Sequence, residues 1–65
     1  MEITVNNKAI TIPHDFKILN LLEHLSYNKS VAVFVNGKQL LMSQYDDYLL
    51  KDKDTVKIIK PLGGG

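Results

Sequence analysis

The chain has 65 residues, of which 45% are hydrophobic, and a formal net charge of +1. This length allows one small domain, and the hydrophobic content argues against intrinsic disorder. Every basic residue is a lysine and no residue is a cysteine. Nucleic-acid binding is therefore not expected, and disulfides, thiolate ligands and thiol nucleophiles are excluded. No basic leader and no long apolar run is present, so we expect a soluble protein without a membrane partner.

The first expected element is a β-hairpin. Residues 1–5 alternate apolar and polar side chains, which is the period of a half-buried strand. Asn6 and Asn7 follow, and asparagine tolerates the positive φ that tight hairpin turns demand. A second alternating stretch then runs until Pro13, which ends the strand.

A helix is expected next. Apolar residues at i, i+3, i+4 and i+7 form one stripe and predict a helix from about Phe16 to Ser26. Asp15 precedes it as the expected N-cap. The stripe consists of Ile18, Leu21, Leu22 and Leu25.

A second hairpin follows the helix. Residues 31–35 are β-branched and aromatic, as in a strand. Asn36 and Gly37 are a strong signal for a tight hairpin turn, so residues 38–42 should return as a short fourth strand.

The last third of the chain contains one ambiguous segment and one clear strand. Residues 43–50 predict either an irregular crossing or one helical turn. Asp52 and Asp54 are expected to form a turn. Residues 55–60 are then the last strand.

This order of elements predicts an α+β fold. A helix with a single apolar stripe can cover one face of a mixed sheet of four to five strands. The simplest arrangement is the β-grasp, or ubiquitin-like, roll, in which the last strand lies centrally and parallel to the first. Residues 1–60 would form this domain and residues 61–65 a flexible tail ending in Gly-Gly. The predicted core consists of Ile3, Val5, Ile10, Ile12, Ile18, Leu22, Leu25, Val33, Val35, Val56 and Ile58.

Alternation along the strands also predicts an exposed apolar patch. If Val56 points to the helix, Ile59 points to the opposite sheet face, and so does Phe34. Together with Leu62, these side chains could form a docking surface at the base of the tail. The alternative is that residues 43–50 cover them.

No catalytic or metal site is predicted. Asp46 and Asp47 are expected to be solvated surface charges. His14 and His24 lack companions at metal-ligand spacing. The tyrosines within residues 43–50 are expected to pack with solvated hydroxyls.

The whole chain resembles the sulfur carrier proteins of thiamine biosynthesis, the ThiS family, and more distantly the small subunit of molybdopterin synthase. The stretches that carry this resemblance are "MEITVNNK", "ILNLLEHL", "VAVFVNGKQL" and "DTVKIIKPLGGG". One departure is Lys53, because the family usually places a glycine before the aspartate. Gly63 is an additional glycine at a position that the family leaves variable.

The resemblance implies a protein cosubstrate rather than an enzyme, with no bound cofactor or metal. An E1-like adenylyltransferase would use ATP to adenylate the carboxylate of Gly65, after Gly63 and Gly64 thread into its channel. Sulfur from a cysteine desulfurase or another persulfide donor would then give a thiocarboxylate, which supplies sulfur to thiazole synthase. The expected location is the cytoplasm, or the plastid stroma for a plastid-encoded protein.

The physical requirements of this chemistry agree with the sequence. Attack of a carboxylate on phosphorus needs close in-line approach, which favours a terminal residue without a Cβ atom. Residues 60–65, when extended, can reach about 20 Å into a partner. Three alternatives remain open: the molybdopterin branch, a ubiquitin-like modifier whose activated carboxylate passes to a lysine, and a plain β-grasp binding module with an incidental tail.

Overall fold

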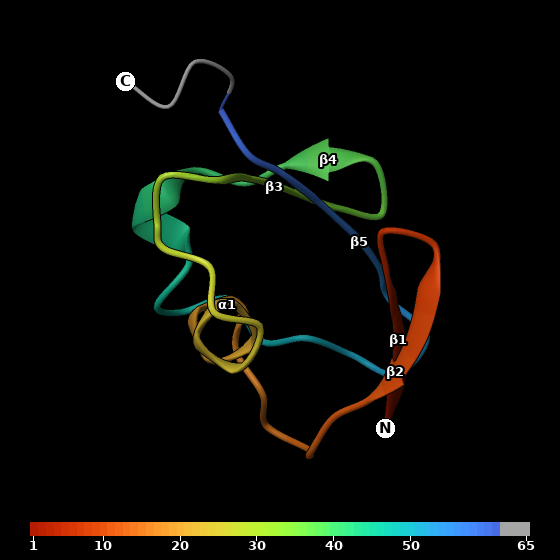
Figure 1. The fold of residues 1–65 in the computed structure, drawn as a ribbon. Helices are drawn as coiled ribbons and strands as arrows, with labels where there is room; N and C mark the ends of the chain where they lie inside the picture. The colour runs from red at the N-terminus through yellow and green to blue at the C-terminus, as the bar shows by residue number, and fades with distance from the viewer. Residues whose placement is uncertain (62–65) are drawn as a thin grey trace.

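A computed structural model describes residues 1–61 of the chain. The elements are strands β1 (Glu2–Val5) and β2 (Lys8–Thr11), helix α1 (Ile18–His24), strands β3 (Ala32–Val35) and β4 (Lys38–Gln39), the 3₁₀ helix η1 (Met42–Gln44) and strand β5 (Thr55–Ile59). All strands join one five-stranded sheet, and α1 lies against one face of it (Figure 1).

The strand order is β2-β1-β5-β3-β4, so the last strand of the chain is the middle strand of the sheet. Strand β5 runs parallel to β1, with Val5 opposite Val56, and antiparallel to β3, with Val33 opposite Ile58. The predicted β-grasp fold is confirmed, including the central place of the last strand and its parallel pairing with the first.

Both predicted hairpin turns are present. The φ angles are 48° at Asn6 and 71° at Asn7, and they are 52° at Asn36 and 85° at Gly37. Two consecutive positive φ values are the geometry of a type I′ turn, which matches the twist of the flanking strands.

Helix α1 is shorter than the predicted span, with seven residues from Ile18 to His24. The prediction of Asp15 as N-cap is wrong. Asp15 has a φ of 62°, and the N-cap is Lys17, whose backbone N–H donates to Asn20 Oδ1 at 2.9 Å. Lys17 forms a β-bridge with Leu49, and this long-range pairing holds the chain extended immediately before the helix.

The C-terminal end of α1 is a Schellman motif. Ser26 has a φ of 64°, and its N–H donates to the carbonyl of Glu23 at 3.1 Å. The N–H of Tyr27 donates to the carbonyl of Leu22 at 2.8 Å. This pair of hydrogen bonds satisfies free carbonyl groups of the last turn and ends the helix.

The core lies between α1 and the inner face of the sheet. Nine of the predicted core residues are buried, whereas Ile10 and Leu25 are only partly buried and pack against the core. Ile10 lies on edge strand β2, and Leu25 lies past the end of the helix, so each keeps contact with solvent. The prediction missed five buried side chains: Leu21, Val31, Leu40, Tyr45 and Leu50.

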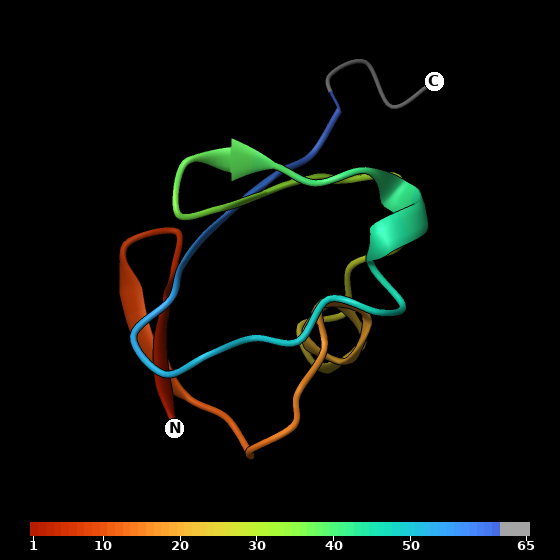
Figure 2. The same cartoon turned by 180° about the vertical axis from the view of Figure 1, so that it is seen from behind.

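The segment from residue 43 to 50 begins in η1 and continues as an irregular crossing (Figure 2). It packs at the start of α1, where the N–H of Leu19 donates to the carbonyl of Tyr45 at 2.9 Å. The expected solvated hydroxyl is wrong for Tyr45, because this side chain is buried and its hydroxyl donates to the carbonyl of Val31 at 2.8 Å.

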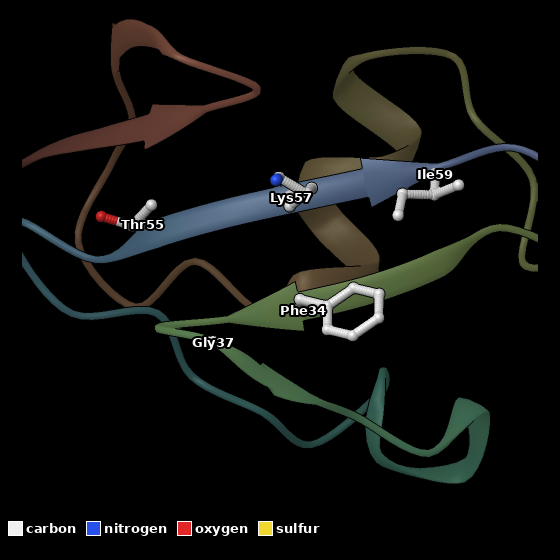
Figure 3. A pocket seen from close by; sticks show the side chains of 5 residues that line it. All are labelled: Phe34, Gly37, Thr55, Lys57 and Ile59. Carbon is white, nitrogen blue, oxygen red and sulfur yellow. The ribbon is translucent and has the colours of Figure 1, made fainter.

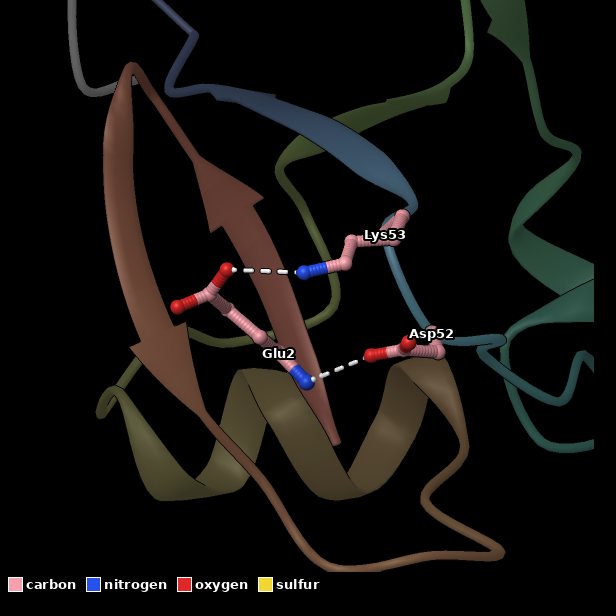
Figure 4. A network of polar contacts seen from close by, with 3 residues as sticks. All are labelled: Glu2, Asp52 and Lys53. Carbon is pink, nitrogen blue, oxygen red and sulfur yellow. Dashed lines mark hydrogen bonds and ion pairs between the residues drawn. The ribbon is translucent and has the colours of Figure 1, made fainter.

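A polar network joins the start of β1 to the turn before β5 (Figure 4). The N–H of Glu2 donates to Asp52 Oδ1 at 2.8 Å, and the Glu2 carboxylate pairs with Lys53 Nζ at 3.2 Å. The hydrogen bond from Glu2 is the main reason that the pKa of Asp52 is lowered. Lys53 has a φ of 72°, a left-handed conformation that glycine adopts more readily than lysine.

Within residues 1–61, no helix has the length and apolar character needed to cross a membrane.

Candidate functional site

The end of strand β5 is clamped by one side chain from the first hairpin turn. Asn6 Oδ1 accepts the N–H of Ile58 at 2.8 Å, and Asn6 Nδ2 donates to the carbonyl of Ile58 at 3.2 Å. The backbone N–H of Asn6 also donates to the carbonyl of Val56 at 3.0 Å. The side-chain amide thus takes the place of a further β1 residue, so the point where the chain leaves the sheet is fixed.

The start of β5 is held in the same way by the second hairpin turn. Asn36 Oδ1 accepts the N–H of Thr55 at 2.9 Å, and the N–H of Asn36 donates to the carbonyl of Thr55 at 2.8 Å. Asn36 Nδ2 donates to Asp54 Oδ1 at 2.9 Å, while Asp54 Oδ2 accepts the N–H of Lys51 at 2.8 Å. Asp54 is a turn former, as predicted, but it is also buried, with only 7% of its surface exposed.

The two faces of β5 differ as the alternation predicted. Val56 and Ile58 are buried against the core, which confirms the predicted register of this strand. Lys57 and Ile59 lie on the opposite face and are exposed, with 47% of Ile59 accessible to solvent.

A shallow groove of about 470 Å³ lies on this outer face, away from α1 (Figure 3). Phe34 from β3 is half-buried and lies beside the two exposed β5 residues, because Phe34 pairs with Lys57 across the strands. No residue between 43 and 50 lines the groove, so that segment does not cover the part of the predicted patch formed by Phe34 and Ile59. The groove is lined by Phe34, Gly37, Thr55, Lys57 and Ile59.

Two of the predicted docking residues, Phe34 and Ile59, are therefore brought together. The remaining site residues lie outside the described residues 1–61, and their roles stay predictions. These are Leu62, Gly63, Gly64 and Gly65.

The polar residues considered for chemistry are dispersed. Asp46 is exposed and pairs with Lys29 at 3.2 Å, and His24 lies edge-on to the ring of Phe16 at 6.2 Å. Among residues 1–61, no three side chains of His, Cys, Asp or Glu gather in a way that could hold a metal ion.

Sequence reasoning missed the clamping roles of Asn6, Asn36 and Asp54. The two asparagines were predicted as turn residues from their dipeptides alone. The only further signal was that each turn starts with asparagine, the residue whose side chain can imitate a backbone amide.

A model of the ThiS family matches residues 1–65. The chain belongs to the ThiS family.

The chain is also similar to solved structures. It is 32% identical to thiamine biosynthesis protein (ThiS) from Geobacter metallireducens, whose crystal structure superposes with a TM-score of 0.86 and 100% coverage of both chains. The solution structure of a thiamine biosynthesis protein from the same organism is also 32% identical and has a TM-score of 0.79. The match to that structure covers 100% of this chain and 88% of the other. No curated protein sequence matches significantly. The resemblance to ThiS proteins drawn from the sequence is confirmed.

Proposed function

We propose that this ThiS-family protein is a sulfur carrier for thiazole formation in thiamine biosynthesis, and that it serves as a cosubstrate of partner enzymes. The observation that carries the proposal is the family match over the whole chain. The fold supports it, because β5 is the middle strand and is clamped at Ile58 by Asn6. The residues after Pro61 would therefore leave a rigid body at a fixed point.

The reacting group would be the carboxylate of Gly65. In the active site of an E1-like adenylyltransferase, a carboxylate oxygen would attack the α-phosphorus of ATP and release pyrophosphate, giving an acyl adenylate. The outer sulfur of a persulfide, supplied by a cysteine desulfurase or another donor, would then displace AMP. A thiol reductant would break the sulfur–sulfur bond and leave the thiocarboxylate, which thiazole synthase would consume. Gly63 and Gly64 would let the tail enter a narrow channel, since neither carries a Cβ atom.

Recognition of the carrier would use the outer groove. Glycines offer no side chains to read, so the body must supply most of the docking affinity. Phe34 and Ile59 present apolar surface there, and Leu62 would extend it toward the tail. Lys57 lines the same groove, which favours a partner surface that is apolar with an acidic side chain facing Lys57.

The test of the function is reconstitution. The full chain, ATP, the adenylyltransferase, a persulfide donor and a thiol reductant should together raise the intact mass by the difference between sulfur and oxygen. A variant lacking Gly63, Gly64 and Gly65, which ends on a residue with a Cβ atom, is the matched control and should stay unchanged. Adducts joined to lysine amines would instead identify a ubiquitin-like modifier. Sulfur transfer to a molybdopterin synthase subunit, in place of thiazole synthase, would move the protein to the molybdopterin branch.

The groove has its own test. Phe34→Ala or Ile59→Ala should weaken binding to the adenylyltransferase by roughly 1–3 kcal/mol, the usual cost of truncating an interface anchor. Replacing Gly65 should block ATP–pyrophosphate exchange and leave binding nearly intact. A folded double variant of Phe34 and Ile59 that binds and is adenylated like the parent would remove the groove from the proposal.

A further inference from the structure

The chain leaves β5 alongside the loop between α1 and β3. Lys60 Nζ lies over the ring of Tyr27, 5.4 Å from the ring centroid. This distance is within the range of a cation–π interaction. Lys60 and Pro61 also line a hollow of about 350 Å³ together with residues of this loop, on a different part of the surface from the groove of Figure 3.

Tyr27 is a rigid platform because the end of the helix holds it. Its backbone N–H is the outer donor of the Schellman motif, bonded to the carbonyl of Leu22 at 2.8 Å. Its half-buried side chain packs against the core. The backbone of Tyr27 is therefore held by the end of the helix, and its side chain is held by packing against the core.

Lys60 is restrained from both directions along the chain. Ile58 lies two residues before Lys60, and both of its backbone groups are hydrogen-bonded to the side chain of Asn6. Immediately afterwards, Pro61 restricts the backbone of the residue before it to extended conformations. With its ammonium group over Tyr27, Lys60 has limited freedom in backbone and side chain alike.

We propose that Tyr27 is a positioning residue for the point where the tail begins: its ring holds the Lys60 side chain and so restrains the chain at Lys60 and Pro61. This inference rests on the proposed function, because the direction matters only if a partner must receive the residues that follow. A chain whose exit at Lys60 is already restrained has less orientational freedom left to lose when a partner binds the residues that follow. The free energy of an exposed cation–π pair corresponds to a factor of about two to five in the fraction of correctly directed tails.

The first experiment uses the free protein and needs no partner. The ring current of Tyr27 should shift the ε-methylene protons of Lys60 upfield in the NMR spectrum. The shift should disappear in Tyr27→Leu, which keeps apolar packing without a ring, and return in Tyr27→Phe. A parent protein in which these protons show no ring-current shift overturns the proposal, whatever the fate of the proposed function.

The second experiment measures adenylation with the adenylyltransferase and ATP. Tyr27→Leu and Lys60→Gln should each lower kcat about two- to fivefold and leave the dissociation constant for docking unchanged, because the groove is intact. Lys60→Gln keeps the packing of Tyr27, so it remains informative if Tyr27→Leu is less stable. Tyr27→Phe and Lys60→Arg, which preserve ring and cation, should recover most of the rate. The double variant should lose no more than either single variant.

The outcomes distinguish the positioning role of Tyr27 from the proposed carrier function. If the parent is adenylated and Lys60→Gln has the parental kcat, the positioning role is overturned and the carrier function stands. If the parent itself is not adenylated, the carrier function fails, and the ring-current measurement still decides whether Tyr27 holds Lys60.

Discussion

The Asn6–Asn7 turn and the Asn36–Gly37 turn are built alike and differ in what their first asparagine contacts. Both turns have positive φ at both central residues, and both direct the asparagine side chain onto β5. Asn6 bonds only to backbone groups, whereas Asn36 also donates to the buried carboxylate of Asp54. Two turns that both begin with asparagine therefore hold β5 through different partners, and we expect the two contacts to contribute unequally to stability.

The largest effect is expected at Asn36. Asn36→Gly keeps the positive φ of the turn but removes the carboxamide, so the buried Asp54 carboxylate loses a hydrogen-bond donor. Unfolding in urea should show a loss of about 1.5–3 kcal/mol, the usual contribution of a hydrogen bond to a charged group. Asn36→Ala should lose roughly 1–2 kcal/mol more, because alanine is strained at positive φ. Parental stability in Asn36→Gly would show that the contact with Asp54 contributes nothing.

Asn6→Gly should have a smaller effect. It removes two hydrogen bonds between neutral groups, each contributing about 0.5–1.5 kcal/mol, at a partly exposed site where water can replace them. We expect a loss near 1 kcal/mol in urea unfolding. Amide exchange at Ile58 should accelerate by more than exchange at Val33, a buried residue of the neighbouring strand that serves as the internal reference. Equal acceleration at both residues would mean that Asn6 stabilises the whole sheet rather than the end of β5.

The turn before β5 also contains a residue in the left-handed backbone conformation, but this residue is a lysine and not an asparagine or glycine. Lys53 has a φ of 72°, which costs a lysine about 1–2 kcal/mol. Lys53→Gly removes this strain but adds the backbone entropy of glycine and loses the exposed pair with Glu2. The net expectation is a gain of about 0.5 kcal/mol. Lys53→Ala, which loses the pair and keeps the strain, is the control and should be less stable than Lys53→Gly.

The smallest effect is expected at Asp52. Its pKa is lowered in the folded protein, mainly by the hydrogen bond from the N–H of Glu2. A depressed folded pKa means that this contribution to stability is complete above the unfolded pKa, near 3.9, and is lost as the pH falls through the folded value. Asp52→Asn should flatten the stability profile below about pH 4 relative to the parent.

Local signals in the sequence were sufficient for much of the fold. The two turn dipeptides, the strand alternation and the register of Val56 and Ile58 depend on neighbouring residues only, and they are confirmed. The docking pair of Phe34 and Ile59 followed from the same alternation. Its exposure on one groove is observed, while its use by a partner stays a proposal.

The features that the sequence could not show depend on contacts between distant segments. Aspartate is a preferred N-cap residue, so Asp15 was a reasonable prediction. The pairing of Lys17 with Leu49 keeps the chain extended at Lys17, and the helix therefore begins only at Ile18. The burial of Asp54 and both asparagine clamps arise only after β5 inserts between β1 and β3. The contact of Lys60 with Tyr27 likewise joins the end of the chain to the end of α1.

The central position of β5 also bears on how the protein is made. Strands β1 and β3 each pair with β5, and no pairing joins them to each other. While the chain is being synthesised, the two hairpins have no shared strand until residues 55–59 emerge, and isolated hairpins are at best marginally stable in water. A chain that ends before residue 55 would therefore hold two hairpins that no strand joins. Assembly of the sheet waits for nearly the whole chain, so the protein is expected to fold only late in its synthesis.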